Sequence, residues 1–213
     1  MLINLQNLIN YTVMIRHIRW LKNETNMKMI ARKIRQGESI VMPTDTVYGI
    51  LTSCFSAKGI KKIYRMKKRE TNKPFLVLVP DLKSVKDLVV PGEYKAKKDF
   101  LKKAFKNPVT VILKAKRHLP GAVLKDKKVA IRIPGDKVLK ALLRKSGVPL
   151  VAPSANRSGG KILRFPWQII REFKNSSDHI FWKYMIWDIR PSTIIDLSGE
   201  GIKYIRIGRG KVG

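Results

Sequence analysis

The sequence predicts an α/β protein built on one twisted, mixed sheet with helices packed against it. Segments with the roughly 3.6-residue periodicity of helices alternate along the chain with short apolar segments bordered by proline or glycine. Hydrophobic residues make up 44% of the 213 residues, close to the roughly 45–50% of globular domains. The chain can therefore bury a core, and its length fits one domain at roughly 100–200 residues per domain.

Apolar residues at helical spacing predict the helices. Met27, Ile30 and Ile34 mark one helical face, and Gly37 follows where a helix ends. Pro166 suits the first turn of another helix, because the N–H that proline lacks is unpaired there. That helix is expected to run from residue 166 to 173, and further helices are expected around residues 60–64, 101–105 and 138–143.

Short apolar runs predict the strands. One run, at residues 39–42, leads into Pro43, and a second, at 75–79, lies between Pro74 and Pro80. The remaining strands are expected at residues 109–113, 129–133, 150–152, 193–197 and 204–207.

Residues 1–26 differ from the rest and are predicted to be an N-terminal extension of unknown role, before a catalytic domain at 27–213. Leucine and isoleucine at helical spacing predict a short amphipathic helix there, on Leu2, Leu5, Leu8 and Ile9. Alternatively, translation begins later, at Met14, Met27 or Met29.

The charge is strongly positive: 45 Lys and Arg against 15 Asp and Glu give +30. Basic residues on a folded surface can neutralise nucleic-acid phosphates. A solvated surface in an organism with lysine-rich proteins explains the same number, and charge bears on partners rather than on fold.

Several classes of protein and site are excluded. No apolar run approaches the roughly 20 residues that cross a bilayer. One cysteine, Cys54, allows no internal disulfide, and the three histidines lie far apart, so no metal site of His and Cys is expected. The first residues lack the basic segment of a secretory signal, which predicts a cytoplasmic protein.

Polar side chains recur where predicted strands end, which is where α/β proteins bind ligands. They occur in PTDTVYG at 43–49, APSANRSG at 152–159 and PSTIID at 191–196. Such residues are also common in turns, so each segment alone has two interpretations. Together they indicate a site for an anionic small molecule.

Basic residues beside these segments favour the same chemistry. Lys67 and Arg69 would share one side if this segment is extended, and would then suit a triphosphate. Taken alone, the segment favours the other interpretation, a solvated basic helix end. Arg132 lies in an apolar strand and needs an anionic partner, from the protein or from a ligand. Arg206 places another guanidinium at a strand end.

No familiar catalytic motif competes with this interpretation. There is no Walker loop, and the GxGxxG at 208–213 has no helix after it to cap a phosphate, so we interpret it as a chance match. Cys54 has no histidine nearby in sequence and is expected in the core. The pattern indicates a site that positions a nucleotide and a small anion without a side-chain nucleophile.

In this order, the motifs resemble the YrdC/Sua5 family of threonylcarbamoyl-AMP synthases. PTDTVYG, the KxR of Lys67 and Arg69, VAIRIP at 129–134 and the SAN of APSANRSG carry the resemblance, from about Met27 to Gly210. It implies a single YrdC-like domain. It also implies synthesis of L-threonylcarbamoyladenylate and pyrophosphate from L-threonine, bicarbonate and ATP, a nucleotidyltransferase reaction in tRNA t6A modification.

The resemblance also implies roles for individual residues. The threonine ligands would be Thr44, Arg132, Ala152 and Ser192. The ATP ligands would be Lys67, Arg69, Lys73, Ser154, Asn156 and Arg206, and the catalytic set would be Lys67, Arg69, Ser154 and Asn156. Mg²⁺ would arrive with ATP, without protein ligands.

The resemblance implies a functional link to a tRNA threonylcarbamoyl transferase complex. The positive charge predicts, in addition, direct binding of tRNA or double-stranded RNA. The alternative is an RNA-binding paralogue of the same fold without synthase activity. The chain departs from the family pattern at Leu78, where relatives often have histidine, at Glu70 after KxR, and in the loop at 184–190 before Ser192.

Overall fold

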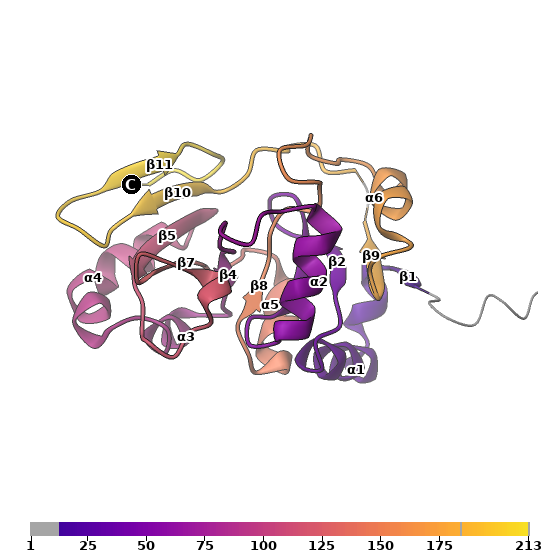
Figure 1. Ribbon diagram of the computed structural model, residues 1–213, viewed down its shortest axis with the longest axis horizontal. Helices are drawn as coiled ribbons and strands as arrows, with labels where there is room; N and C mark the ends of the chain where they lie inside the picture. The colour runs from indigo at the N-terminus through magenta and orange to yellow at the C-terminus, as the bar shows by residue number, and fades with distance from the viewer. Residues whose placement is uncertain (1–12, 184, 213) are drawn as a thin grey trace, which may run out of the picture.

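The computed structural model describes residues 13–183 and 185–212 and shows a mixed α/β fold (Figure 1). The helices are α1 (Glu24–Arg35), α2 (Ala57–Lys67), α3 (Leu82–Lys86), α4 (Pro91–Ala104), α5 (Lys137–Ser146) and α6 (Pro166–Phe173), with 3-10 turns η2 (Ile18–Lys22) and η3 (Gly121–Val123). The strands are β1 (Met14–His17), β2 (Ile40–Pro43), β3 (Tyr48–Ser53), β4 (Val77–Leu78), β5 (Val109–Lys114), β6 (Leu124–Lys125), β7 (Lys128–Arg132), β8 (Leu150–Val151), β9 (His179–Trp182), β10 (Thr193–Asp196) and β11 (Lys203–Arg206).

The strands form one mixed sheet, as predicted. Their order is β1-β9-β2-β3-β8-β4-β7-β5-β10-β11, and β6 pairs with β7. The pairs β1/β9, β2/β9, β4/β7 and β5/β10 are parallel, while β2/β3, β3/β8 and β5/β7 are antiparallel. Figure 1 shows β10 and β11 at one end of the molecule and β1 and β9 at the other.

Helices cover both faces of the central strands. In β2, Ile40 and Met42 join the apolar cluster that contains the buried residues of α1 and α5, whereas Val41 joins the cluster that contains those of α2 and α6. Successive strand residues point to opposite faces, so β2 is buried on both sides. None of the helices in the described residues has the length and apolar composition to cross a membrane.

The N-terminal residues are placed only in part. The expected amphipathic helix at Leu2–Ile9 lies outside the described residues. Residues 14–17 form β1, which pairs with β9, and Leu21 is fully buried against α1. The boundary at residue 26 stays a prediction, although residues 14–22 pack on the sheet and its helices.

Some elements differ from the expectation. The strands β1, β3, β6 and β9 and the short helix α3 are additional to the predicted elements. Helix α4 begins at Pro91, ten residues before the predicted stretch at 101–105. All six residues of β3 are buried, so it shows none of the polar alternation that marks a half-exposed strand.

The glycines of the C-terminal GxGxxG have a packing role. Gly208 lies against the segment 191–193. Its N–H donates to the Thr193 hydroxyl at 3.0 Å, and a Cβ at Gly208 would lie 2.6 Å from the carbonyl carbon of Ser192. The motif therefore allows close backbone approach beside Ser192.

We predict that Gly208→Ala destabilises the fold, because the new Cβ meets backbone atoms that cannot move aside. Overpacking of this kind costs about 1–3 kcal/mol. Denaturant unfolding measures the change, with Gly199→Ala as the matched control, because a Cβ there meets nothing within 4 Å. Equal stability of the two variants would contradict the packing role.

Candidate active site

Two cavities meet at the ends of the central strands. The small cavity, about 130 Å³, is lined by residues 44–49 together with Leu76, Leu78, Arg132, Pro134, Ala152, Ser154, Ile162, Pro191, Ser192 and Arg206. The large cavity, about 570 Å³, lies over β5, β7, β10 and β11. Leu76, Ser154 and Arg206 line both. The large volume is within the roughly 300–1,000 Å³ of ligand pockets.

The loop between β2 and β3 forms one wall of the small cavity. The Thr44 hydroxyl donates to the Val47 carbonyl at 2.7 Å and accepts from the Thr46 N–H at 3.1 Å. These bonds make a tight turn of the kind that serine and threonine side chains support. The segment PTDTVYG is thus a turn, and it also lines a cavity as expected of a ligand site, because the turn presents its side chains to that cavity.

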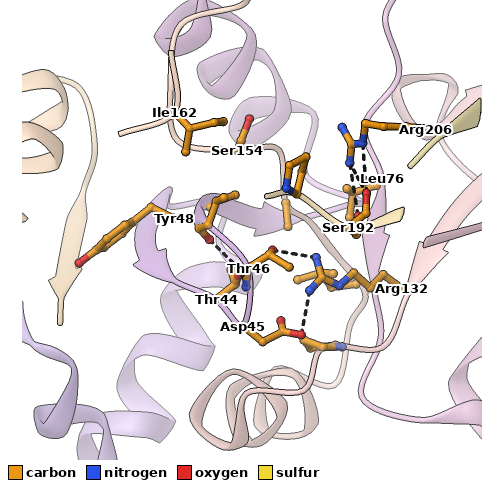
Figure 2. A pocket seen from close by; sticks show the side chains of 16 residues that line it. Thr44, Asp45, Thr46, Tyr48, Leu76, Arg132, Ser154, Ile162, Ser192 and Arg206 are labelled. Atoms are coloured by element: carbon orange, nitrogen blue, oxygen red, sulfur yellow. Dashed lines mark hydrogen bonds and ion pairs between the residues drawn. The ribbon is translucent and has the colours of Figure 1, made fainter. Parts of the chain in front are cut away.

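Arg132 at the end of β7 finds its anionic partner in the protein. Its Nη2 lies 2.8 Å from Oδ2 of Asp45, and its Nη1 donates to the Thr46 hydroxyl at 3.0 Å. The backbone N–H of Gly135 donates to the same Asp45 oxygen at 2.9 Å. Figure 2 shows Arg132 linked to Thr46 and Asp45 below Thr44. Since Arg132 is only 5% exposed, this pairing offsets the cost of a buried charge.

Arg206 on β11 brings a second guanidinium to the junction of the cavities. Its Nε and Nη2 donate to the Ser192 carbonyl at 3.1 and 2.9 Å, and the Ser192 hydroxyl lies 2.8 Å from that of Thr110. Burial and then the charge of Arg132 lower the pKa of Arg206. Two neighbouring guanidinium groups make this junction attractive to an anion.

Lys67, the last residue of α2, holds the 153–160 loop. Its ammonium donates to the carbonyls of Ser154 and Asn156, both at 2.5 Å, and to Oδ1 of Asn156 at 3.3 Å. The Ser154 hydroxyl donates to the same Oδ1 at 2.6 Å. Burial, and then the charge of Arg69, lower the pKa of Lys67 to about 8. Its donors are occupied by the loop, so Lys67 positions Ser154.

The KxR segment is a helix end, the second of the two interpretations of this sequence, and not an extended segment. Lys68 caps α2 with a left-handed backbone, φ 47° and ψ 48°, and this turn brings both Lys67 and Arg69 to the large cavity. Arg69 donates to the carbonyls of Lys73 and Pro74 at 3.1 and 3.0 Å and lies over the Phe75 ring. The predicted shared side is therefore produced by a helix end.

The structure brings most of the predicted site residues together. The small cavity contains Thr44, Arg132, Ala152 and Ser192; the large cavity contains Lys67 and Arg69; Ser154 and Arg206 line both. Asn156 lines neither cavity and acts through Ser154. Lys73 also lines neither and pairs at 3.2 Å with exposed Glu70.

The sequence analysis omitted Asp45 and Thr46 from the site. A signal was available: a buried arginine in a strand requires a carboxylate, and PTDTVYG contains one. Only the packing of β7 beside the 44–47 loop shows that this carboxylate and Arg132 meet.

Comparison with known proteins identifies the fold family. A family model named Sua5_yciO_yrdC, described as "Telomere recombination", matches residues 32–208. The chain belongs to this Sua5/YciO/YrdC family. A Methanocaldococcus jannaschii relative, assigned provisionally as a threonylcarbamoyl-AMP synthase, is 32% identical over 182 residues, 85% of each chain.

Two of the similar proteins are longer than this chain. The threonylcarbamoyl-AMP synthase of Bacillus subtilis is 35% identical over 139 residues, which are 64% of this chain and 40% of that protein. The P. abyssi Sua5 structure with L-threonine superposes with a TM-score of 0.80 and 24% identity, covering 92% of this chain and 57% of Sua5. This likeness shows the fold.

Leu78, which departs from the family pattern, lines the small cavity together with Leu76. The two leucines give the cavity an apolar wall. Within residues 13–183 and 185–212, no group of three or more His, Cys, Asp or Glu side chains could hold a metal ion. Cys54 is buried, and burial raises the pKa of its thiol to about 12, so it does not supply a nucleophile at neutral pH.

We predict that Lys67 makes stability depend on pH. Its pKa is about 8 in the folded chain against 10.5 ordinarily, so between these values the unfolded chain binds more protons and the free energy of unfolding rises with pH. The slope is at most about 1.4 kcal/mol per pH unit. Denaturant unfolding should show wild type gaining stability over Lys67→Met from pH 8 to pH 10; a constant difference would contradict the lowered pKa.

Proposed function

We propose that the chain is a threonylcarbamoyl-AMP synthase, which condenses L-threonine, bicarbonate and ATP into L-threonylcarbamoyladenylate and releases pyrophosphate. The observation that carries the proposal is the pair of joined cavities: one of about 130 Å³ with a paired arginine, and one of about 570 Å³ with a basic border. Relatives with threonylcarbamoyl-AMP synthase names, and P. abyssi Sua5 solved with L-threonine, support it.

The small cavity suits threonine. Its volume excludes a nucleotide, and Arg132 provides a guanidinium for the carboxylate. Thr44 and Ser192 border the cavity with hydroxyls, while Ala152 and Leu78 offer apolar surface to the threonine methyl group. These residues would bind and orient the amino acid.

The large cavity suits ATP. Its floor has partly exposed apolar residues, Ile112, Ala130 and Ile194, against which a base can pack. Arg69 and Arg206 border it and would meet the phosphates. Mg²⁺ would enter with ATP as part of the substrate.

The junction of the cavities is where the reacting groups would meet. The product requires a carbamate, which forms when the deprotonated threonine nitrogen bonds to the carbon of bicarbonate and water is lost. A carbamate oxygen then attacks the α-phosphorus, and the bond to pyrophosphate breaks. No side-chain nucleophile is needed, so the protein would act by positioning and by stabilising charge. Arg206 and Ser154 line this junction, and Lys67 with Asn156 would keep Ser154 in place.

The product would then serve a tRNA threonylcarbamoyl transferase complex in t6A formation in the cytoplasm. The charge of +30 favours direct contact with tRNA or double-stranded RNA in addition to synthesis. An RNA-binding paralogue without activity is less well supported, because an RNA binder has no need of the buried Arg132 and the joined cavities.

We predict that the purified chain releases pyrophosphate from Mg-ATP only when L-threonine and bicarbonate are both present. A pyrophosphate assay with mass spectrometry of the adenylate measures this. ATP consumption that is equal without threonine would contradict the proposal, and RNA binding without any adenylate would favour the paralogue.

We predict that Arg132→Lys raises the threonine concentration needed for half-maximal activity by about 10- to 100-fold, because a forked, charged hydrogen bond contributes about 1.5–3 kcal/mol. The ATP dependence should change little. Arg157→Lys is the matched control, since Arg157 is exposed and pairs with Glu172. Equal weakening of both substrates would remove Arg132 from the threonine side.

A further inference from the structure

In the Arg132–Asp45 ion pair, both side chains have buried polar atoms that make no hydrogen bond with the part of the chain that the structure describes. Oδ2 of Asp45 is held by Gly135 N–H and by Arg132, whereas Oδ1 is buried and has no hydrogen-bond partner in the described residues. Nε of Arg132 is also buried without a partner there, and Nη2 makes only the ion pair with Asp45.

Buried polar atoms without a hydrogen bond lower the stability of the folded protein. A buried donor or acceptor without a partner costs about 1–3 kcal/mol, and more when it is charged. Here an acceptor and a donor of opposite charge belong to one ion pair whose charged atoms lie 2.8 Å apart. A ligand that satisfies both needs a donor for Asp45 beside an acceptor for Arg132, and the strongest bonds come from a positive and a negative group close together.

An α-amino acid meets this requirement, because its ammonium and carboxylate groups are attached to the same carbon. Bicarbonate or phosphate could bind Arg132, but each carries only negative charge, which the Asp45 carboxylate repels. Asp45 and Arg132 both line the small cavity, and Figure 2 shows the Asp45 carboxylate directed toward the Arg132 guanidinium.

We propose that Oδ1 of Asp45 accepts a hydrogen bond from the α-ammonium group of the amino-acid substrate while Arg132 binds its carboxylate. The ion pair is then a receptor for a zwitterion, and Asp45 is a substrate-binding residue. This inference rests on the proposed function, since it concerns the amino-acid side of that site.

A purely structural role for Asp45 makes a different prediction. If Asp45 only orients Arg132, its loss weakens every carboxylate ligand equally. If it binds the ammonium, its loss weakens only ligands that have one. (R)-3-hydroxybutanoate is threonine without the amino group, so it separates the two roles.

The experiment measures dissociation constants for L-threonine and (R)-3-hydroxybutanoate by ligand-observed NMR, without ATP or bicarbonate. Wild type should bind L-threonine at least about 10-fold more tightly than the analogue, the effect of one charged hydrogen bond. Asp45→Asn keeps an acceptor for Gly135 and should lose about that factor for L-threonine while binding the analogue equally well or better.

The matched control is Asp99→Asn, an exposed aspartate on α4, which should change neither constant. Equal losses for both ligands in Asp45→Asn, or unchanged threonine binding, would overturn the inference and leave the proposed function intact. Near-equal affinities in wild type would overturn it even if the variant failed to fold. No threonine binding by wild type would instead count against the proposed function.

Discussion

The site depends on one buried arginine. Arg132 ends a central strand, and its charge would be untenable in the core without Asp45 and Thr46. Their bonds fix the 44–47 loop against β7, and Arg209 adds to the same point by donating to the Asp45 carbonyl at 2.9 Å. Strand β7, the loop after β2 and the C-terminal segment are thus held around one guanidinium, and the small cavity lies among them.

A second buried cation organises the other half of the site. Lys67 is 2% exposed and holds the 153–160 loop through neutral oxygens, with no carboxylate among its hydrogen-bond partners. Such a charge lowers stability near neutral pH, where an apolar side chain would not. A buried charge of this kind, with a lowered pKa, is typical of functional sites. Lys67 thereby holds Ser154, and the Ser192 carbonyl holds Arg206, at the boundary between the cavities.

Much of this could be predicted from local pattern. The helices at residues 24–35, 137–146 and 166–173 follow from apolar spacing and from Gly147 and Pro166 at their ends. The polar segments at 43–49 and 152–159 were recognisable as ligand-binding corners because they follow strands. Strand β3 was not predictable in this way: it is buried on both faces and begins inside PTDTVYG, so its residues carry no alternation.

The sequence by itself determined the fold class, the family resemblance and the candidate anion-binding residues, because motifs and periodicity are local properties. The tertiary structure alone decided how these residues work. It showed that Arg132 pairs with Asp45, that Lys67 holds a loop and that Lys73 lies outside both cavities. These outcomes depend on which distant strands become neighbours in the sheet. Hydrogen bonding and burial of the whole chain select that order, and residue spacing does not encode it.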